Sequence, residues 1–393
     1  MHILPAIIGL LLPWCMVSNA QEPDTSWTKA YPKSVLEAKT GDQDDLRAHS
    51  VTETYDHGFA FTGHCCCHHC RGDLYVVRTD SLGGILWTER YNDDEDNWNE
   101  VGNCIRETHD RGFIIVGVVI EFAQTMGSKM WMVKIDSAGN RLWSKKFGGS
   151  AYHDYSSAHS VQETYDNGFI IAGYEKLNGS AKNSEVFLVR TNALGDTLWT
   201  KRFGGNKNDG ARCVRETRDS GFVLCGFSNS FGDGSSDVYI IRTDRTGNVL
   251  WSKTFGKREI SDGGFSIVET ADHGFALVGQ TNDYQDVYLI KTDSAGEMVW
   301  ENEIGSDTTA ETGRDIREVP GSGYIIGGHT APEDTKGYIL RTDANGQEVW
   351  SKTFSSYMDC AIYSIELTSD GGVVAAGRHR GKEEAYIIKF SGR

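Results

Sequence analysis

Two consecutive stretches, Ile267–Gly279 (IVETADHGFALVG) and Val287–Trp300 (VYLIKTDSAGEMVW), contain every segment of a phrase that the chain repeats. The phrase has four short segments rich in β-branched and aromatic residues, separated by Asp-x-Gly and Ser-Ala-Gly turns. Segments of this kind joined by tight turns are typical of β-hairpins. The clearest mark of each copy is a tryptophan: Trp27, Trp87, Trp143, Trp199, Trp251, Trp300 and Trp350.

These tryptophans lie 49 to 60 residues apart, and a period of this size indicates a repeat architecture. In segments such as Phe169–Ala172 every side chain is apolar, so both faces of the sheet are expected to be buried. No long stretch has a helical period. Four strands per copy, buried on both faces and repeated radially, predict an all-β, seven-bladed β-propeller.

The two ends of the chain carry incomplete copies. Residues 27–31 form a lone tryptophan segment, whereas the last copy, residues 361–390, ends without one. We expect residues 27–31 to supply the outer strand of the last blade, which closes the ring and leaves no open sheet edge. Residues 21–393 are then predicted to form a single propeller domain.

The run Thr292–Trp300, in which Asp-x-x-Gly and three further residues precede the tryptophan, resembles the repeat of PQQ-type (quinoprotein-like) propellers. It is similar to the repeats of secreted tandem-repeat propellers of unknown function. The resemblance implies the fold and no activity, since quinoprotein dehydrogenases usually have eight blades, and PQQ is not expected. The sialidase Asp-box differs, because Gly296 lies four residues before Trp300 instead of three, so glycosidase activity is not implied.

Residues 1–20 are predicted to be a cleaved secretory signal. The run from Ile3 to Val17 is almost wholly apolar and ends in Ser18-Asn19-Ala20, a small-residue cleavage site. It is too short to span a membrane as a helix, and we expect no membrane span elsewhere. We therefore expect a monomeric, extracellular protein, and in a eukaryotic host Asn178 is a candidate N-glycosylation site.

The formal net charge is −16, and no basic stripe is visible in the sequence. A nucleic-acid partner is therefore not expected, because phosphate contacts need clustered lysine and arginine. The Asp-x-Gly and Ser-Ala-Gly turns are uniform and fall on one face, whereas the connections on the opposite face vary. Variable loops on a rigid scaffold usually carry binding, so we expect a protein or glycan ligand on that face.

The most unusual of these loops offers four thiols and three imidazoles, which suit zinc or copper(I). Disulfides are the alternative in an oxidising compartment. The cluster consists of His64, Cys65, Cys66, Cys67, His68, His69 and Cys70. Elsewhere, Cys104 and Cys213 occupy a position that serine holds in other copies, and Cys213 and Cys225 lie on neighbouring segments.

Acidic residues that precede the first segment of several copies form a second candidate site. A ring of oxygen ligands at the channel mouth could hold calcium. The alternative is structural, because an Asp or Glu that enters a strand usually accepts backbone N–H bonds. The members of this candidate cation ring are Glu100, Asp209, Asp262 and Glu311. The glutamates repeated within the first segment, Glu53, Glu107, Glu163, Glu216, Glu269 and Glu318, are interpreted as scaffold.

No catalytic motif is found, and repeated structural residues dominate the chain. The leading hypothesis is a secreted propeller that acts as a binding or scaffold protein through its variable loops. The alternative is a zinc- or copper-dependent enzyme, such as an oxidoreductase, that uses the His64–Cys70 cluster. A third hypothesis, a hydrolase or lyase in the central channel, rests only on analogy of fold. Loop histidines that could serve such an enzyme are His153, His159, His329 and His379.

Overall fold

The computed structural model describes residues 24–32, 34, 44–67, 73–93, 98–121, 127–149, 151–178, 183–281, 285–305, 309–331, 336–354, 360–379 and 384–391. In this part the chain is all-β and forms 28 strands in antiparallel sheets of a propeller-like repeat. The prediction of an all-β chain of repeated four-stranded units is confirmed. Within the same residues, no helix has the length and apolar character needed to cross a membrane.

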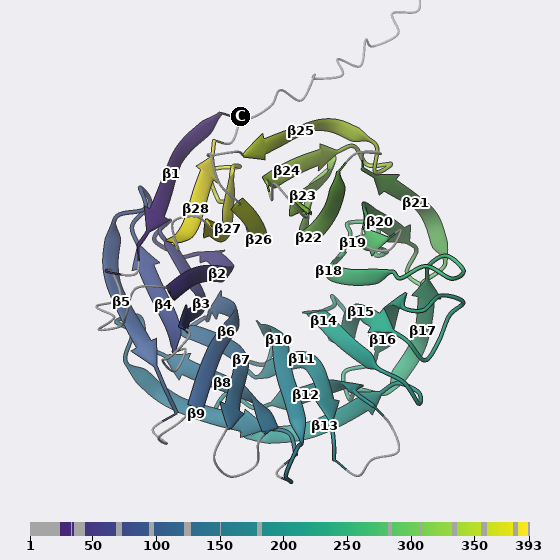
Figure 1. Cartoon of the computed structure of the whole chain (residues 1–393), viewed down its shortest axis with the longest axis horizontal. Coiled ribbons are helices and arrows are strands. Elements are labelled where there is room, and N and C mark those ends of the chain that lie inside the picture. The colour runs from purple at the N-terminus through teal and green to yellow at the C-terminus, as the bar shows by residue number, and fades with distance from the viewer. Residues whose placement is uncertain are drawn as a thin grey trace, which may run out of the picture.

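Each four-stranded sheet contributes one strand to each of four positions between the centre and the rim (Figure 1). The innermost strands are β2 (Asp44–Glu53), β6 (Trp98–Glu107), β10 (Tyr155–Glu163), β14 (Asp209–Glu216), β18 (Gly263–Glu269), β22 (Ala310–Val319) and β26 (Cys360–Leu367). The second strands are β3 (Phe59–Cys67), β7 (Phe113–Glu121), β11 (Phe169–Lys176), β15 (Phe222–Ser228), β19 (Phe275–Thr281), β23 (Gly323–Ala331) and β27 (Val373–His379).

The third and outer strands complete the sheets. The third strands are β4 (Leu74–Thr79), β8 (Gly127–Ile135), β12 (Glu185–Thr191), β16 (Asp237–Thr243), β20 (Asp286–Thr292), β24 (Gly337–Thr342) and β28 (Glu384–Phe390). The outer strands are β5 (Ile85–Tyr91), β9 (Arg141–Phe147), β13 (Thr197–Phe203), β17 (Val249–Phe255), β21 (Met298–Ile304), β25 (Glu348–Phe354) and β1 (Thr25–Tyr31).

Four of the four-stranded sheets are built from consecutive strands, whereas a fifth combines the two ends of the chain. β1 pairs antiparallel with β28, with Trp27 opposite Lys389 and Tyr31 opposite Ala385. The sheets of β6–β9 and β10–β13 are further joined by one parallel bridge between Ser128 and Tyr155. Figure 1 shows all sheets arranged around a central axis, with β1 lying beside β28.

Hydrophobic clusters fill the space between each sheet and the next, and the tryptophans complete them. Trp143 packs edge-on against Phe169 of the following sheet, with ring centroids 6.0 Å apart. Gly195 lies against the same indole with φ at +77°, and a Cβ there would approach Trp143 to 2.7 Å. Only glycine fits such a left-handed, crowded turn, which explains the Gly of the repeated phrase. The tryptophans therefore belong to the scaffold that joins neighbouring sheets.

The Asp-x-Gly turns lie at one end of the sheets, which we call the turn end. The same set of contacts recurs in these turns from sheet to sheet. Asp166 accepts a hydrogen bond from Thr164, and the buried Arg190 of β12 reaches the same carboxylate. The guanidinium also donates to the carbonyls of Phe169 and Thr191. A buried cation is thereby paired and hydrogen-bonded, which is the condition for burying charge in a fold.

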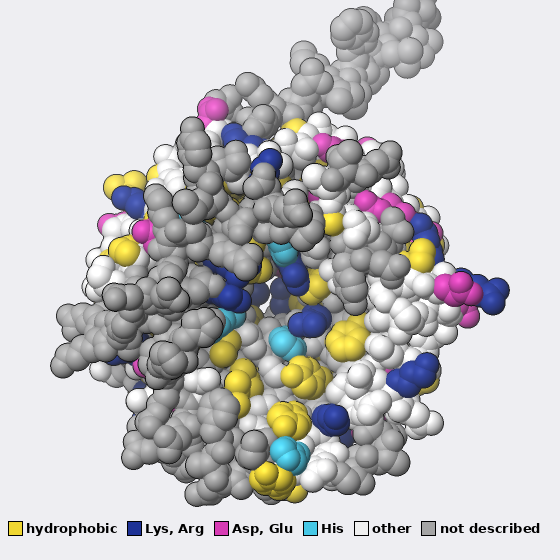
Figure 2. All heavy atoms as spheres, viewed as in Figure 1, with side chains coloured by type: hydrophobic (Ala, Val, Ile, Leu, Met, Phe, Trp, Pro, Cys, Tyr) yellow, Lys and Arg dark blue, Asp and Glu magenta, His cyan; other side chains and the backbone are white. Residues whose placement is uncertain are grey.

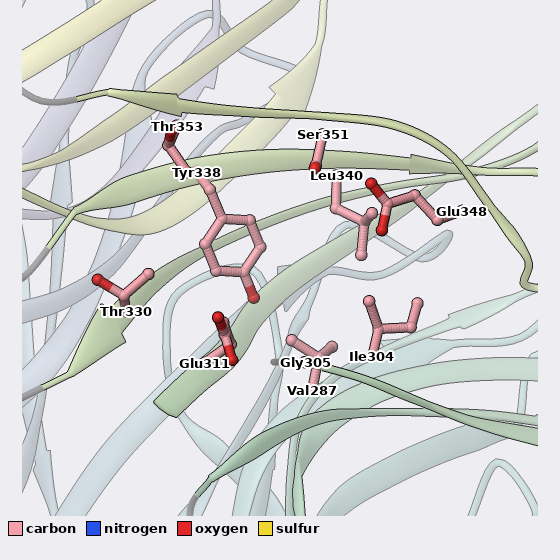
Figure 3. Close-up of a pocket in the computed structure, with 10 residues that line it drawn as sticks. All are labelled: Val287, Ile304, Gly305, Glu311, Thr330, Tyr338, Leu340, Glu348, Ser351 and Thr353. Carbon is pink, nitrogen blue, oxygen red and sulfur yellow. The ribbon is translucent and has the colours of Figure 1, made fainter. Parts of the chain in front are cut away.

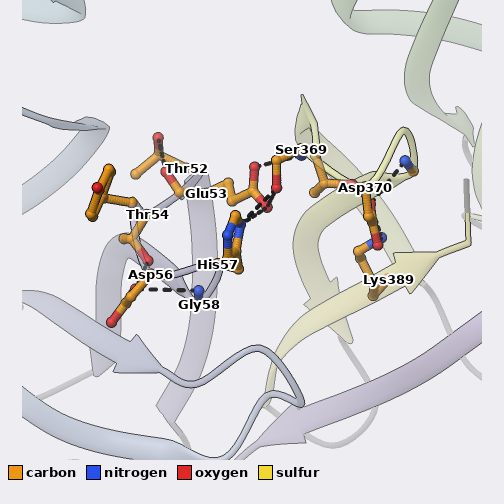
Figure 4. A network of polar contacts seen from close by, with 12 residues as sticks. Thr52, Glu53, Thr54, Asp56, His57, Gly58, Ser369, Asp370 and Lys389 are labelled. Carbon is orange, nitrogen blue, oxygen red and sulfur yellow. Dashed lines mark hydrogen bonds and ion pairs between the residues drawn. The ribbon is translucent and has the colours of Figure 1, made fainter.

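Adjacent sheets are clasped at the turn end by the repeated glutamates. Glu107 accepts the backbone N–H of Tyr55 in the preceding turn at 2.9 Å, and Glu216 accepts that of Tyr165 at 2.9 Å. Figure 4 shows the same clasp between the first and last sheets, where Glu53 accepts the N–H of Ser369 at 2.7 Å. These contacts support the interpretation of the repeated glutamates as scaffold.

Near the axis, a serine, cysteine or aspartate of each inner strand bonds to the next inner strand. Ser50 accepts the N–H of Ile105 at 3.2 Å, and Asp315 accepts that of Ile365 at 3.0 Å. Cys104 and Cys213 occupy the same position and are buried and unbridged. Cys213 pairs in register with Cys225 as a free thiol, so no disulfide joins these two strands.

Candidate functional site

Every inner strand carries a β-bulge at an equivalent place, and one residue stands in each bulge. The flanking positions are small or apolar on one side and Ser, Cys or Asp on the other, whereas the bulged residue changes from copy to copy. Bulges re-aim side chains and are common beside functional sites. The seven bulged residues, called the axial residues below, are His49, Asn103, His159, Arg212, Phe265, Arg314 and Tyr363.

Three axial residues from successive sheets form a stack. The guanidinium of Arg314 lies 4.2 Å from the centre of the Phe265 ring, and that of Arg212 lies 5.7 Å from it. Such cation–π contacts partly compensate for the loss of water around a guanidinium. Burial, together with Arg212, nevertheless lowers the pKa of Arg314 to about 10. The fold therefore holds two like charges close together at the axis.

On the other side of the axis, histidine and tyrosine rings meet. Tyr363 lies 5.9 Å from His49 and 5.9 Å from His329 between ring centroids, and His49 lies 4.8 Å from His64. Burial and the nearby Arg314 and Arg378 lower the pKa of His329 to about 3. At neutral pH these imidazoles are therefore uncharged.

His159 belongs to the same cluster. Its ring lies 5.7 Å from that of Tyr174, and burial followed by the charge of Arg212 lowers its pKa to about 3. The charged groups that lower the pKa values of His64, His159 and His329 are arginines and another histidine, and no carboxylate of the described chain acts on them. The axial residues thus create a cationic, aromatic environment in a strongly acidic protein.

Figure 2 shows this face of the molecule. Basic, histidine and hydrophobic side chains surround the central opening, whereas the visible acidic side chains lie toward the rim. We call this opening the axial mouth. It lies at the end of the sheets opposite the Asp-x-Gly turns, since His64 and His329 lie near the far ends of β3 and β23.

Deeper along the axis, toward the turn end, the charges are paired. Arg317 donates to Asp315 at 2.5 Å and to Glu366 at 3.0 Å. Asp315 also accepts the hydroxyl of Ser266 at 2.7 Å. By contrast, Nε of Arg314 and Nδ1 of His329 are buried at the mouth with no hydrogen bond from the described part of the chain. Buried polar atoms normally have partners, so these two atoms mark a place for a ligand or solvent.

A groove of about 610 Å³ leads outward from the mouth over the sheets of β10 to β19. Its inner part contains Arg212, Tyr174 and Phe227, and its volume lies in the range of small-molecule sites. The rest of its lining is mostly hydroxyl- or amide-bearing: Ser184, Asn208, Asn229, Ser235, Ser236, Ser261 and Gln280.

A smaller cavity of about 220 Å³ lies between the sheets of β18–β21 and β22–β25 (Figure 3). The hydroxyl of Tyr338 points toward Glu311 in this view. Burial raises the pKa of Tyr338, with a further contribution from Glu311. None of the axial residues lines this cavity, although the charge of Arg314 acts on Tyr338.

The structure places Glu100, Asp209 and Glu311 on the inner strands of three different sheets and Asp262 directly before the inner strand of a fourth. Asp209 accepts the N–H of Gly205 at 2.8 Å, and Asp262 accepts that of Lys257 at 2.9 Å. Glu100 accepts the N–H of Asp93 at 3.1 Å, and burial raises its pKa to about 7. Across the described ranges, no three His, Cys, Asp or Glu side chains gather as metal ligands, Glu311 included. This geometry favours the structural alternative, in which these acids stabilise the start of a strand.

The sequence-predicted His64–Cys70 cluster falls largely outside the described residues, whereas Asn178 is described. His64 is described at the axial mouth, and the backbone of Cys65, Cys66 and Cys67 continues β3. The side chains of these three cysteines, and the whole of His68, His69 and Cys70, lie outside the description. Asn178 is exposed, and its amide donates to the carbonyl of Tyr152 at 2.7 Å.

The bulged positions were not predicted from the sequence, because they lie within strands and not in the variable loops. His159 and His329 were named as loop histidines, but they lie on β10 and β23. The aligned copies do contain a signal for these positions. The bulged residue differs from copy to copy, whereas the residues on either side of it are mostly small, as in Ala48-His49-Ser50. A variable residue inside a repeated strand cannot be explained by the scaffold.

Comparisons with known proteins confirm the fold alone. No family model and no curated protein sequence matches the chain. A crystal structure of a protein of unknown function from Dyadobacter fermentans is similar, with a TM-score of 0.52 and 10% identity over 94% of this chain and 99% of that one. The extracellular domain of a protein assigned as a hybrid two-component system of B. thetaiotaomicron has a TM-score of 0.52 and 11% identity. The match covers 93% of this chain and 43% of that one.

Proposed function

We propose that this protein is a seven-bladed β-propeller of the PQQ-type repeat class whose ring is closed non-covalently by β1. Support comes from the pairing of β1 with β28 and from the packing of Trp27 on Phe59 of the first sheet. At the axis, Ser364 accepts the N–H of Val51 at 3.4 Å. These contacts join the first and last sheets in the same way as the other neighbouring pairs.

In this proposal the protein is secreted and acts by binding a ligand. One structural neighbour is an extracellular domain, which agrees with the secretory signal predicted for residues 1–20. We place the ligand at the axial mouth. The observation that carries the proposal is that seven equivalent bulges, on a scaffold that is otherwise repeated, present five different residue types to one axis.

Binding of the mature chain to an array of immobilised glycans and extracellular proteins tests this function. The variant is Phe265→Ala, which removes the ring between two arginines, and the control is Arg245→Ala in an exposed turn. We expect the native chain and the control to retain a ligand that the Phe265 variant loses. Identical binding patterns for all three proteins would contradict a ligand site at the mouth.

A zinc- or copper-dependent enzyme is retained as the second candidate. It has one observation in its favour, because His64, the first residue of the His64–Cys70 cluster, lies beside His49 at the mouth. Elemental analysis of the purified chain, paired with a thiol count by mass spectrometry, decides it. Stoichiometric metal with free thiols at residues 65–70 favours the enzyme, whereas disulfides without metal favour the binding protein.

A further inference from the structure

We infer that the ligand of the axial mouth is an acidic oligosaccharide, whose carboxylate is bound between Arg212 and Arg314 and whose neutral hydroxyl groups lie in the adjoining groove. This inference rests on the proposed binding function and specifies its substrate class. It is carried by the charge of the mouth, by the buried polar atoms there, and by the chemistry of the groove.

The axial mouth concentrates positive charge in an acidic protein. The protein carries a formal net charge of −16, yet the two guanidinium groups that flank Phe265 lie within 6 Å of the same ring. Like charges in a partly buried site repel each other, and a bound anion reverses that repulsion. A site that concentrates positive charge against the net charge of the protein is therefore built for an anionic group.

Arg314 at the mouth and Arg317 deeper in the channel differ in their partners. Arg317 deeper in the channel has its carboxylate partners Asp315 and Glu366, so its role is structural. Arg314 is contacted by Phe265 and keeps a buried Nε that no described group accepts. Guanidinium groups bind carboxylates through two parallel N–H bonds, and Nε is one of the usual donors of such a pair. A ligand carboxylate would supply the acceptor that the fold does not.

The lining of the groove suits a sugar better than an acidic peptide. A polyacidic peptide needs cations along its length, but in the groove the cations are Lys176 and Arg212. The other polar lining groups are hydroxyls and amides, which match the hydroxyl groups of a sugar, and Tyr174 and Phe227 offer aromatic faces beside them. One acidic group followed by neutral, hydroxyl-rich units fits this lining better than a chain of carboxylates.

Isothermal titration calorimetry with the full mature chain tests the inference. The probes are a trimer of galacturonic acid, a galactose trimer of equal length, and a hexaglutamate peptide. The expected result is that the galacturonate trimer binds, that the galactose trimer binds at least tenfold more weakly, and that the peptide does not bind. Loss of one charged hydrogen-bond pair is expected to weaken binding about ten- to a hundredfold.

Two variants and one matched control locate the site. The Arg212 side chain is exposed, so Arg212→Gln is expected to leave folding intact. Arg314→Lys keeps the positive charge but removes the paired N–H donors. The control, Arg245→Gln, makes the same change as Arg212→Gln in a distant turn. We expect both mouth variants to weaken galacturonate binding and Arg245→Gln to have no effect. Equal binding of both sugars, or binding that ignores Arg212 and Arg314, overturns the acidic ligand.

The two proposals fail differently. If the galactose trimer binds and Phe265→Ala abolishes that binding, the mouth is a ligand site and only the acidic chemistry is wrong. If hexaglutamate binds in place of the sugars, the ligand is an acidic protein segment and the sugar inference is overturned. If no probe binds, the inference is overturned, and the array experiment with Phe265→Ala decides the binding function separately.

Discussion

The turn end and the axial mouth are built on the same strands but use side chains in opposite ways. At the turn end, buried cations meet a carboxylate, as Lys291 meets Asp272 at 3.0 Å and Lys389 meets Asp370 at 2.9 Å. At the mouth, Arg314 and His329 keep buried nitrogen atoms without a hydrogen bond among the described residues. The difference separates scaffold from function, because paired contacts that repeat from sheet to sheet stabilise the fold, whereas a buried polar atom without a partner costs stability.

One pair of neighbouring sheets lacks the contact between a glutamate and a backbone N–H at the turn end. This contact is absent between the sheets of β22–β25 and β26–β28. Pro320 occupies the turn position whose N–H is the donor in other copies, and proline has no N–H to donate. The glutamate that would accept it is replaced by Leu367. Donor and acceptor are lost together, so no buried carboxylate is left without its partner.

The largest predicted effect comes from the histidines of the mouth. An unfolded histidine titrates near pH 6.5, whereas the folded pKa values of His159 and His329 are about 3. The unfolded state therefore binds more protons below about pH 6.5, and stability falls as the pH falls toward 3. Each histidine contributes up to about 1.4 kcal/mol per pH unit in that window. Chemical denaturation between pH 7.5 and 4.5 measures this loss.

The groups that surround these histidines determine which control variant is needed. His329 meets Arg314, Arg378 and Tyr363, whereas His159 meets Arg212, His49 and Tyr174. Glu100 acts in the opposite sense, because a carboxyl with a raised pKa adds stability as the pH falls. The double variant H159Q/H329Q is therefore compared with the native chain at each pH. An equally steep loss in the variant would show that the mouth does not cause it.

Trp27 tests whether the joint between the two chain ends resembles the others. Its ring packs on Phe59 at 5.7 Å and against Gly83 of the first sheet. We expect Trp27→Ala to lower the free energy of unfolding by about 2 to 4 kcal/mol, because half-buried aromatic packing is lost. Leu86→Ala is the control, since that side chain is 57% exposed. A loss no larger than that of the control, measured by denaturant unfolding, would exclude β1 from the closure of the ring.

These contacts also explain what the sequence could predict. Each residue that recurs in the repeated phrase makes the same contact in its own copy. One example is the packing of Trp143 against Gly195 and Phe169. Repetition therefore predicted the strands, the turns and the scaffold roles of the glutamates. The partner of the lone Trp27 strand could be named because only one copy lacked such a strand.

The site could not be predicted in the same way. Whether Arg212 and Arg314 meet depends on bulges that turn residues of successive sheets toward one axis, and a bulge leaves no fixed residue type in the sequence. The acids of the expected calcium ring belong to different sheets of the described structure for a related reason. Asp209 and Asp262 have a local use, the stabilisation of backbone N–H groups in their own connections, and this use needs no common centre.

A smaller effect is predicted for the turn-end clasp. Glu216 accepts the N–H of Tyr165 and lies on the strand that follows it around the axis. Glu216→Gln should cost about 1 kcal/mol, because a charged acceptor becomes a neutral one while the shape is kept. Thermal unfolding at neutral pH measures this change, with Glu348→Gln on the exposed outer strand β25 as the control. If both substitutions cost the same, the clasp does not stabilise the joint.

The smallest effect has the opposite sign, and it tests the comparison most directly. Arg212 is exposed and lies near Arg314, whose pKa its charge helps to lower. Arg212→Gln should therefore leave the stability of the ligand-free chain unchanged or raise it by a few tenths of a kcal/mol, since like-charge repulsion is relieved. The matched change at the turn end, Arg190→Gln, removes the cation that binds Asp166 and should destabilise the chain by more than 1 kcal/mol. If Arg212→Gln proved as costly as Arg190→Gln, the mouth would be scaffold, and the division of roles between the two ends of the sheets would be wrong.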